Sequence, residues 1–180
     1  TIWPSGYASQ NITRFDNAGK PLSPPDGWTF NGRLGEMQGI IVAGNGDIWA
    51  VDQGKSQIVH LPKGDPAKAR IYCQNTSKNP LENPCGLFAP FHLAIDQQDR
   101  IWVSNNIGSS VIRFHVYDPT KIEKFDVGFG GSGMAIDSQG NVWHAERFGV
   151  SERGRLKLLE MMAAYAVSGE KAATEVLVHN

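Results

Sequence analysis

The stretch PFHLAIDQQDRIWVSNNIGSSVIRF, residues 90–114, decides the fold of this chain. It contains an apolar run, a short polar turn, a second apolar run around Trp102, and a third run that ends at Phe114. Short apolar segments separated by polar turns indicate consecutive antiparallel β-strands. We therefore expect a hairpin followed by a third strand.

The same arrangement recurs around four tryptophans that each follow Ile or Val. These are Trp3, Trp49, Trp102 and Trp143, at spacings of 46, 53 and 41 residues. Repeats of this length are typical of β-propellers, in which each blade is a small antiparallel sheet. A β-sandwich also has short strands, but it gives no reason to repeat a whole turn-Ile-Trp segment. The sequence predicts an all-β fold of four-stranded propeller blades.

Three segments precede a tryptophan and are expected to form hairpins with two-residue turns. They are GIIVAGNGDIW, HLAIDQQDRIW and GMAIDSQGNVW, with turns at 45–46, 98–99 and 139–140. Third strands are expected to end at Phe15, Leu61 and Phe114, and fourth strands are expected at 69–73 and 123–127.

The number of blades is smaller than a full ring needs. At about 45 residues per blade, the 180 residues supply about 3.5 to 4 blades. The unit around Trp3 also lacks a first strand. Three explanations stay open: a C-terminal strand at 175–178 completes this unit, two chains close one ring, or the chain is part of a longer protein.

The pattern changes after Trp143. Apolar residues at 158, 161, 162 and 165 follow helical spacing among good helix formers. We expect residues 1–155 to form the blades. Residues 156–180 are expected to form a C-terminal helix and a strand, which cap an open edge or contact another subunit.

Composition excludes several classes of partner. Seventeen Lys and Arg residues against eighteen Asp and Glu residues give a net charge of -1, so nucleic acid and anionic membranes are not expected partners. No apolar run approaches the ~20 residues that cross a bilayer. The chain begins at Thr1 without a Met, which is typical of a processed product.

Cys73 and Cys85 bracket the loop QNTSKNPLENP. A disulfide could close this loop, and two free thiols are the alternative. Acceptor triplets for N-glycosylation begin at Asn11 and Asn75. These features favour an extracellular or periplasmic protein.

The hairpins predict which residues lie together. With two-residue turns, paired residue numbers have a constant sum, which pairs Gly39 with Asp52, His92 with Asn105, and Gly133 with Glu146. If the first strands line the axis, these pairs form a polar rim at the end opposite the turns, which we call the axial rim. Its members would be Gln38, Asp52, His92, Asn105, Asn106, Ser132, Glu146 and Arg147.

The units HLAIDQQDRIWVSNN and GMAIDSQGNVWHAERFG resemble the repeats of the streptogramin lyase (virginiamycin B lyase) group. More broadly, they are similar to those of NHL and gluconolactonase-like propellers. The resemblance covers about residues 39–148. It implies a ring of six or seven blades, some of them missing here, with a site at the axial end of the hairpins.

The resemblance also implies chemistry. Lyases of this group open a lactone by elimination with a histidine base and a magnesium ion, and gluconolactonase-like proteins bind a divalent ion through acidic and Asn side chains. His92 would be the base, and Asp52, Asn105 and Glu146 would bind Ca²⁺ or Mg²⁺. Arg147 would neutralise Glu146 or hold a substrate carboxylate. The remaining rim residues, Gln38, Asn106 and Ser132, would contact the substrate.

Each of these residues also has a structural interpretation. His92 could bond a backbone carbonyl, Asp and Asn are ordinary at strand ends, and Glu146 with Arg147 could form a surface ion pair. Two function classes therefore remain. The chain is a metal-assisted lyase or hydrolase of a lactone or ester, or it is a non-catalytic propeller that presents its rim or edge to another protein or to a copy of itself.

Overall fold

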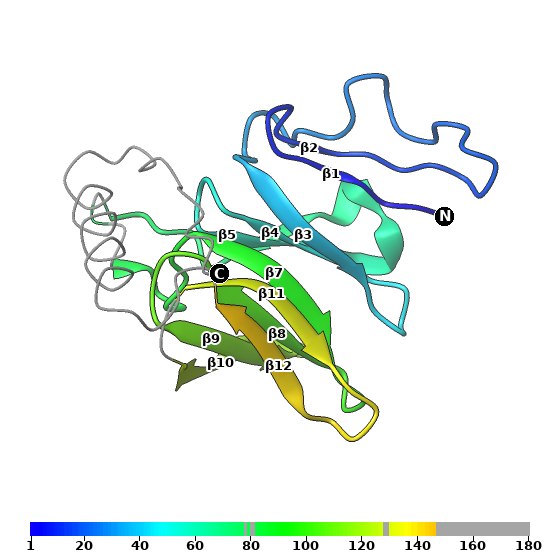
Figure 1. The fold of residues 1–180 in the computed structure, drawn as a ribbon. Coiled ribbons are helices and arrows are strands. Elements are labelled where there is room, and N and C mark those ends of the chain that lie inside the picture. The colour runs from blue at the N-terminus through cyan, green and yellow to red at the C-terminus, as the bar shows by residue number, and fades with distance from the viewer. Residues whose placement is uncertain (78, 80–81, 128–129, 147–180) are drawn as a thin grey trace, which may run out of the picture.

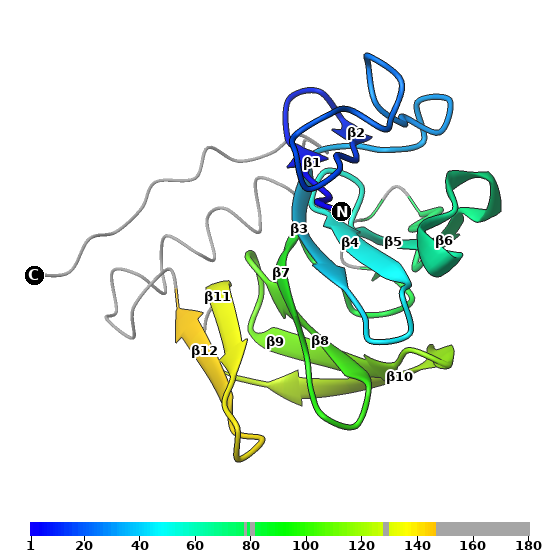
Figure 2. The same ribbon diagram turned by 90° about the vertical axis from the view of Figure 1, so that its right-hand side faces the viewer.

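The blades radiate from one centre, as in a β-propeller (Figure 2). The structure is a computed structural model that describes residues 1–77, 79, 82–127 and 130–146. The second blade has the order β3 (Met37–Val42), β4 (Ile48–Asp52), β5 (Gln57–Leu61) and β6 (Arg70–Tyr72). The third has β7 (Pro90–Ile95), β8 (Arg100–Asn105), β9 (Ser110–His115) and β10 (Asp118–Asp126). The four-stranded antiparallel blades predicted from the sequence are confirmed.

Two smaller sheets flank these blades. The first blade contains β1 (Ser5–Gly6) and β2 (Asn11–Ile12), and the fourth contains β11 (Gly131–Ile136) and β12 (Val142–Glu146). Two short 3-10 helices, η1 (Pro62–Gly64) and η2 (Pro66–Lys68), join β5 to β6. The bridge between Ile2 and Phe15 matches the pair Ile48 and Leu61 of the second blade. The described part of the first blade therefore begins at its second strand, as the sequence predicted.

The first strands β3, β7 and β11 lie side by side at the centre (Figures 1 and 2). A Cβ atom on Gly39 would lie 2.9 Å from Leu93 Cδ1 and 3.1 Å from the Phe91 carbonyl oxygen. Gly39 is thus needed for the close approach of β3 to β7. The missing side chain at Gly39 therefore leaves no space for a ligand, because β7 occupies that space.

Apolar side chains fill the spaces between neighbouring blades. Trp49, Leu93 and Phe114 belong to the cluster between the second and third blades, while Ile12 and Leu61 belong to the cluster between the first and second. Every residue of β4 and β5 is buried, because the second blade has a neighbour on each face. This two-sided burial explains why its strands read as almost continuous apolar runs.

The hairpin turns differ from the prediction by one residue. The loops are 44–46, 97–99 and 138–140, each closed by a bond from the third loop residue to the carbonyl before the loop. That third residue is Gly46, Asp99 or Gly140, and each has a positive φ, which is the geometry of a three-residue turn with a bulge. Figure 1 shows the three turns at the same end of their blades.

A β-bulge interrupts each first strand near its other end. The breaks in register fall between Met37 and Ile40, between Pro90 and His92, and between Gly131 and Gly133. With the longer turns, they shift the predicted pairs: Asp52 pairs with Met37, Asn105 with Pro90, His92 with Ser104, Glu146 with Gly131, and Gly133 with Ala145. Asp52, Asn105 and Glu146 still occupy one equivalent position, the end of the second strand.

Cys73 and Cys85 form a disulfide, which confirms the first of the two alternatives. The expected C-terminal helix and strand at 156–180 lie outside the described residues. Within the described ranges, no helix has the length and apolarity needed to cross a membrane.

Candidate functional site

The three bulges shape the axial rim. The break in register of β3 falls at Gln38 and Gly39, that of β7 at Phe91, and that of β11 at Ser132. A bulge turns side chains out of the regular alternation, and bulges are frequent beside active sites. Because the three inner strands are neighbours, these irregular segments lie at the same end of adjacent blades.

His92 stands where the other two inner strands have glycine, at Gly39 and Gly133. Its backbone N–H donates to Ser104 Oγ at 3.2 Å. Its Nδ1 is buried and has no hydrogen-bond partner among the described residues. Burial lowers the pKa of His92, so its imidazole is neutral at pH 7. A neutral, half-buried imidazole with an unpaired nitrogen can accept a proton or hold a ligand.

Asp52 is fully buried and organises its own blade. Its Oδ2 accepts from the Gly35 N–H at 2.6 Å and from Gln57 Nε2 at 2.7 Å, and its Oδ1 accepts from the Lys55 N–H at 3.0 Å. These bonds tie the chain that enters the blade to the end of β4 and the start of β5. Both carboxylate oxygens are therefore already used.

Asn105 makes the same connection in the third blade. Its Oδ1 accepts from the Phe88 N–H at 2.9 Å, and its Nδ2 donates to the Gly86 carbonyl at 3.0 Å and to Ser110 Oγ at 2.9 Å. Ser110 follows Asn105 by five residues, as Gln57 follows Asp52. We call each of these side-chain connections a blade clasp.

The proposed metal ligands come from the second strands of three different blades. Asp52 and Asn105 each serve a separate blade clasp, and Glu146 is exposed at the end of β12. Within the described ranges, no group of three or more His, Cys, Asp or Glu side chains could hold a metal ion. Asp52 and Asn105 already use polar atoms in the clasp bonds, so the geometry of the described residues gives the metal prediction no support.

The other rim residues have mixed positions. Gln38 Nε2 donates to Gln53 Oε1 at 2.6 Å, and the backbone carbonyl of Gln38 accepts from Ser5 Oγ of the first blade. Asn106 is fully buried, and its backbone N–H donates to the Ala89 carbonyl. Ser132 is half-buried at the bulge of β11. Arg147 lies outside the described residues.

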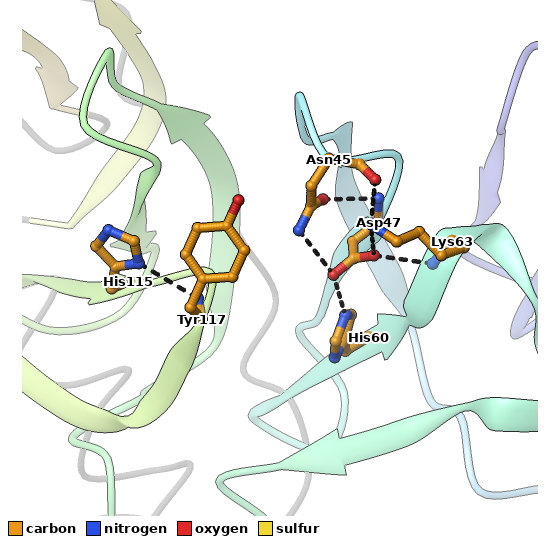
Figure 3. Close-up of polar contacts among 6 residues, drawn as sticks. All are labelled: Asn45, Asp47, His60, Lys63, His115 and Tyr117. Carbon is orange, nitrogen blue, oxygen red and sulfur yellow. Dashed lines mark hydrogen bonds and ion pairs between the residues drawn. The ribbon is translucent and has the colours of Figure 1, made fainter.

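Sequence reasoning missed a second polar cluster at the turn end of the second blade (Figure 3). His60 Nε2 lies 2.9 Å from Asp47 Oδ2, and Asp47 also accepts from the Lys63 N–H and from Asn45 Nδ2. Burial lowers the pKa of His60, and the bond to Asp47 opposes this shift only in part. In the same figure His115 accepts from the Tyr117 N–H as a separate pair on the third blade.

Comparison of the repeats could have identified this cluster. Arg14 and Arg113 occupy the position of His60 in the first and third blades, and each lies over the tryptophan of its own second strand. His60 instead stacks on Trp49 with ring centroids 3.8 Å apart. The second blade is thus the one of these three that replaces an arginine by a buried Asp–His pair.

No protein-family model and no curated protein matches this chain. Solved structures do. Virginiamycin B lyase from Staphylococcus aureus is similar with a TM-score of 0.60 and 20% identity, over 82% of this chain and 45% of the lyase. A catalytically inactive variant of that lyase with quinupristin gives a TM-score of 0.60 and 20% identity, over 81% and 45%.

A more distant likeness involves the extracellular domain of a hybrid two component system from B. thetaiotaomicron. Its TM-score is 0.57 at 12% identity, over 79% of this chain and 18% of that one. This chain therefore spans less than half the length of the lyases that it resembles. At these identities the comparisons establish the architecture: the chain has the β-propeller fold of streptogramin lyases.

Proposed function

We propose that this chain contributes the axial rim of a propeller that opens a lactone or ester, with His92 as the base. The observation that carries the proposal is the half-buried, neutral imidazole of His92, whose Nδ1 lacks a partner among the described residues. It lies beside the bulges of the inner strands, at a position where the neighbouring blades have glycine. The names of the similar lyases support the same class of reaction.

In an elimination, His92 would take a proton from the carbon next to the ester C–O bond. The electrons of the C–H bond form a C=C bond, the C–O bond breaks, and the ester oxygen leaves as part of a carboxylate. A base whose pKa lies near or below the working pH is available in its neutral form for this step. We derive no step through a metal ion, because Asp52 and Asn105 already use their polar atoms in the blade clasps.

Mass spectrometry of quinupristin, the compound named with the inactive lyase variant, after incubation with the purified chain tests this proposal for a lactone ring. Elimination opens the ring without a change in mass, whereas hydrolysis adds the mass of one water. We expect ring opening without added water and a loss of about 100-fold or more in His92→Ala. The matched control is His115→Ala, at the turn end of the third blade, which should retain the activity.

Two outcomes would contradict the assignment. If the native chain opens the ring no faster than buffer does, the proposed activity is contradicted. If the native protein and His92→Ala open it at equal rates, the proposed role of His92 as the base is contradicted. EDTA tests separately whether the reaction needs a metal ion. A rate that falls with EDTA and returns with Mg²⁺ or Ca²⁺ would mean that residues other than those of the blade clasps bind the cation.

A non-catalytic scaffold is the second candidate, and one observation favours it. Trp143 is 64% exposed, whereas the equivalent Trp49 is 0% exposed. Large exposed aromatic side chains are frequent at protein contacts. A solution mass above that of one chain, reduced to one chain by Trp143→Ser, is expected if this face binds a second copy. A mass of one chain in both proteins contradicts self-assembly through it.

An extracellular or periplasmic location fits both candidates. The Cys73–Cys85 disulfide would persist in an oxidising compartment, and one of the similar structures is named as an extracellular domain. Alkylation of the protein isolated from its source, before and after reduction, tests this: the native thiols are expected to be protected until a reductant is added.

A further inference from the structure

A largely open surface cavity of about 480 Å³ lies between the first and second blades, away from the axial rim. Residues 27–31 line one side, and Pro66 with Ala67 of η2 line the other. Figures 1 and 2 show η1 and η2 beside the first blade. The volume is within the range of small-molecule sites. This cavity uses none of the groups of the proposed lactone site.

The walls combine aromatic surface with neutral polar groups. Trp28 and Phe30 line the cavity and are half-buried, because both also pack against the core between the first and second blades. The ring centroids of Trp28 and Trp3 are 5.8 Å apart. The lining also includes Trp28, Thr29 and Asn31, whose side chains carry an indole N–H, a hydroxyl and an amide. None of the lining residues carries a charge.

The backbone of this wall is held in an unusual conformation. Phe30 and Asn31 have φ values of 52° and 58°, in the left-handed region that costs a non-glycine residue about 1 kcal/mol. Bonds on the far side hold the segment: Lys55 Nζ donates to the Gly32 carbonyl and Gln57 Nε2 donates to the Arg33 carbonyl. Strain of this kind is concentrated at binding sites.

We propose that this cavity binds a neutral carbohydrate. A pyranose has an apolar face of C–H groups that can cover the rings of Trp28 and Phe30, and hydroxyl groups that can bond to Thr29, Asn31 and the indole N–H. A purely apolar ligand would bury these polar groups without partners. A charged ligand would find no opposite charge in the wall.

NMR titration of the full ¹⁵N-labelled chain with methyl β-glucoside, maltose, cellobiose and N,N′-diacetylchitobiose tests the proposal. The reporter is the Trp28 indole N–H, identified as the indole signal missing from Trp28→Phe. We expect a saturable shift with at least one of these sugars. Asn31→Gly keeps the left-handed backbone but removes the amide, so the affinity should fall about five- to tenfold.

The control is Gln10→Gly, because Gln10 also has a positive φ of 52° and lies outside the cavity. It should leave the affinity unchanged. Thr29→Val, a substitution of similar shape, should weaken binding independently of any change at Asn31. The proposal is overturned if no sugar gives a saturable shift, if benzyl alcohol shifts the Trp28 signal while the sugars do not, or if both cavity variants bind as tightly as the native chain.

Discussion

Single side chains decide what the second blade does differently. In the third and fourth blades, Asp96 and Asp137 accept from the indole N–H of Trp102 and Trp143. The second blade has Ala43 at that position, so its carboxylate sits on the other side of the turn, at Asp47. There it meets His60, while the indole N–H of Trp49 is buried without a partner among the described residues.

Removal of the Asp47 carboxylate should destabilise the protein. Asp47→Ala leaves the Lys63 N–H and buried His60 without their acceptor, so we expect a loss of about 2–4 kcal/mol in the free energy of unfolding. Urea unfolding followed by tryptophan fluorescence measures it. The control Asp65→Ala removes a partly exposed carboxylate with one main-chain bond and should cost about 1 kcal/mol or less. Equal losses would contradict the role of Asp47.

Stability should fall as the pH is lowered through about 6.5. Burial lowers the folded-state pKa of His60, His92 and His144. Below the ordinary value near 6.5, the unfolded chain binds protons that these folded residues do not, which favours unfolding. The melting temperature should therefore decrease between pH 7 and pH 5, and His92→Gln should reduce this dependence. A melting temperature that rises as the pH is lowered from 7 to 5 would contradict the lowered pKa values of these histidines.

At the scale of secondary-structure elements, the hairpins could be predicted but their register could not. The tryptophan repeat located the second strands, and the fourth strands predicted at 69–73 and 123–127 appear as β6 and β10. The turns look like two-residue turns in the sequence because Asn45-Gly46 suits both kinds of loop. The two kinds of loop differ in the third loop residue, which has a positive φ and is Asp99 rather than glycine in the third blade.

The turns give a pair of opposite predictions. Gly46 has a φ of +85° with no atom closer than 3.9 Å to an added Cβ, so Gly46→Ala should cost about 1 kcal/mol through backbone strain alone. Asp99 has a φ of +57°, so Asp99→Gly should stabilise by a few tenths to about 1 kcal/mol. Chemical denaturation of both variants measures the signs. Equal signs would show that conformational strain does not govern these turns.

The loop between β6 and β7 should depend on its disulfide. The bridge joins residues separated by 12 positions, and a loop of this size typically contributes about 2–4 kcal/mol. Buried Asn83 also holds the loop through bonds to the Ser56 and Cys73 carbonyls. The double variant Cys73→Ser, Cys85→Ser should thus fold with lower stability. A melting temperature equal to that of the native chain would contradict this expectation.

At the scale of the whole molecule, the fold could be predicted from the sequence, but the candidate site could be predicted only in part. The repeat fixed the blades, and equivalence along the repeat placed Asp52, Asn105 and Glu146 at one level. The repeat could not reveal that Asp52 and Asn105 form blade clasps, because the bonding partners, such as Gly35 and Phe88, lie far from them in the sequence. The metal set therefore stays a prediction without support from the geometry.

The unequal covering of the blades predicts a gradient of stability. β4 is buried throughout and paired on both edges, whereas β12 pairs with β11 on one edge and carries the exposed Trp143. Amide protons of β4 should exchange with solvent most slowly and those of β12 far faster. Hydrogen exchange followed by mass spectrometry measures this, and equal protection of the two strands would contradict it.

The blade clasps bear on how such a chain can grow. Each clasp lies within a single repeat: Asp52 joins Gly35 to Gln57, and Asn105 joins Gly86 to Ser110. A duplicated copy of either segment would contain both partners of its own blade clasp. It would pack its apolar faces against the blades on each side. Gene duplication of such a segment would therefore preserve its clasp, because all partners of the clasp are copied together.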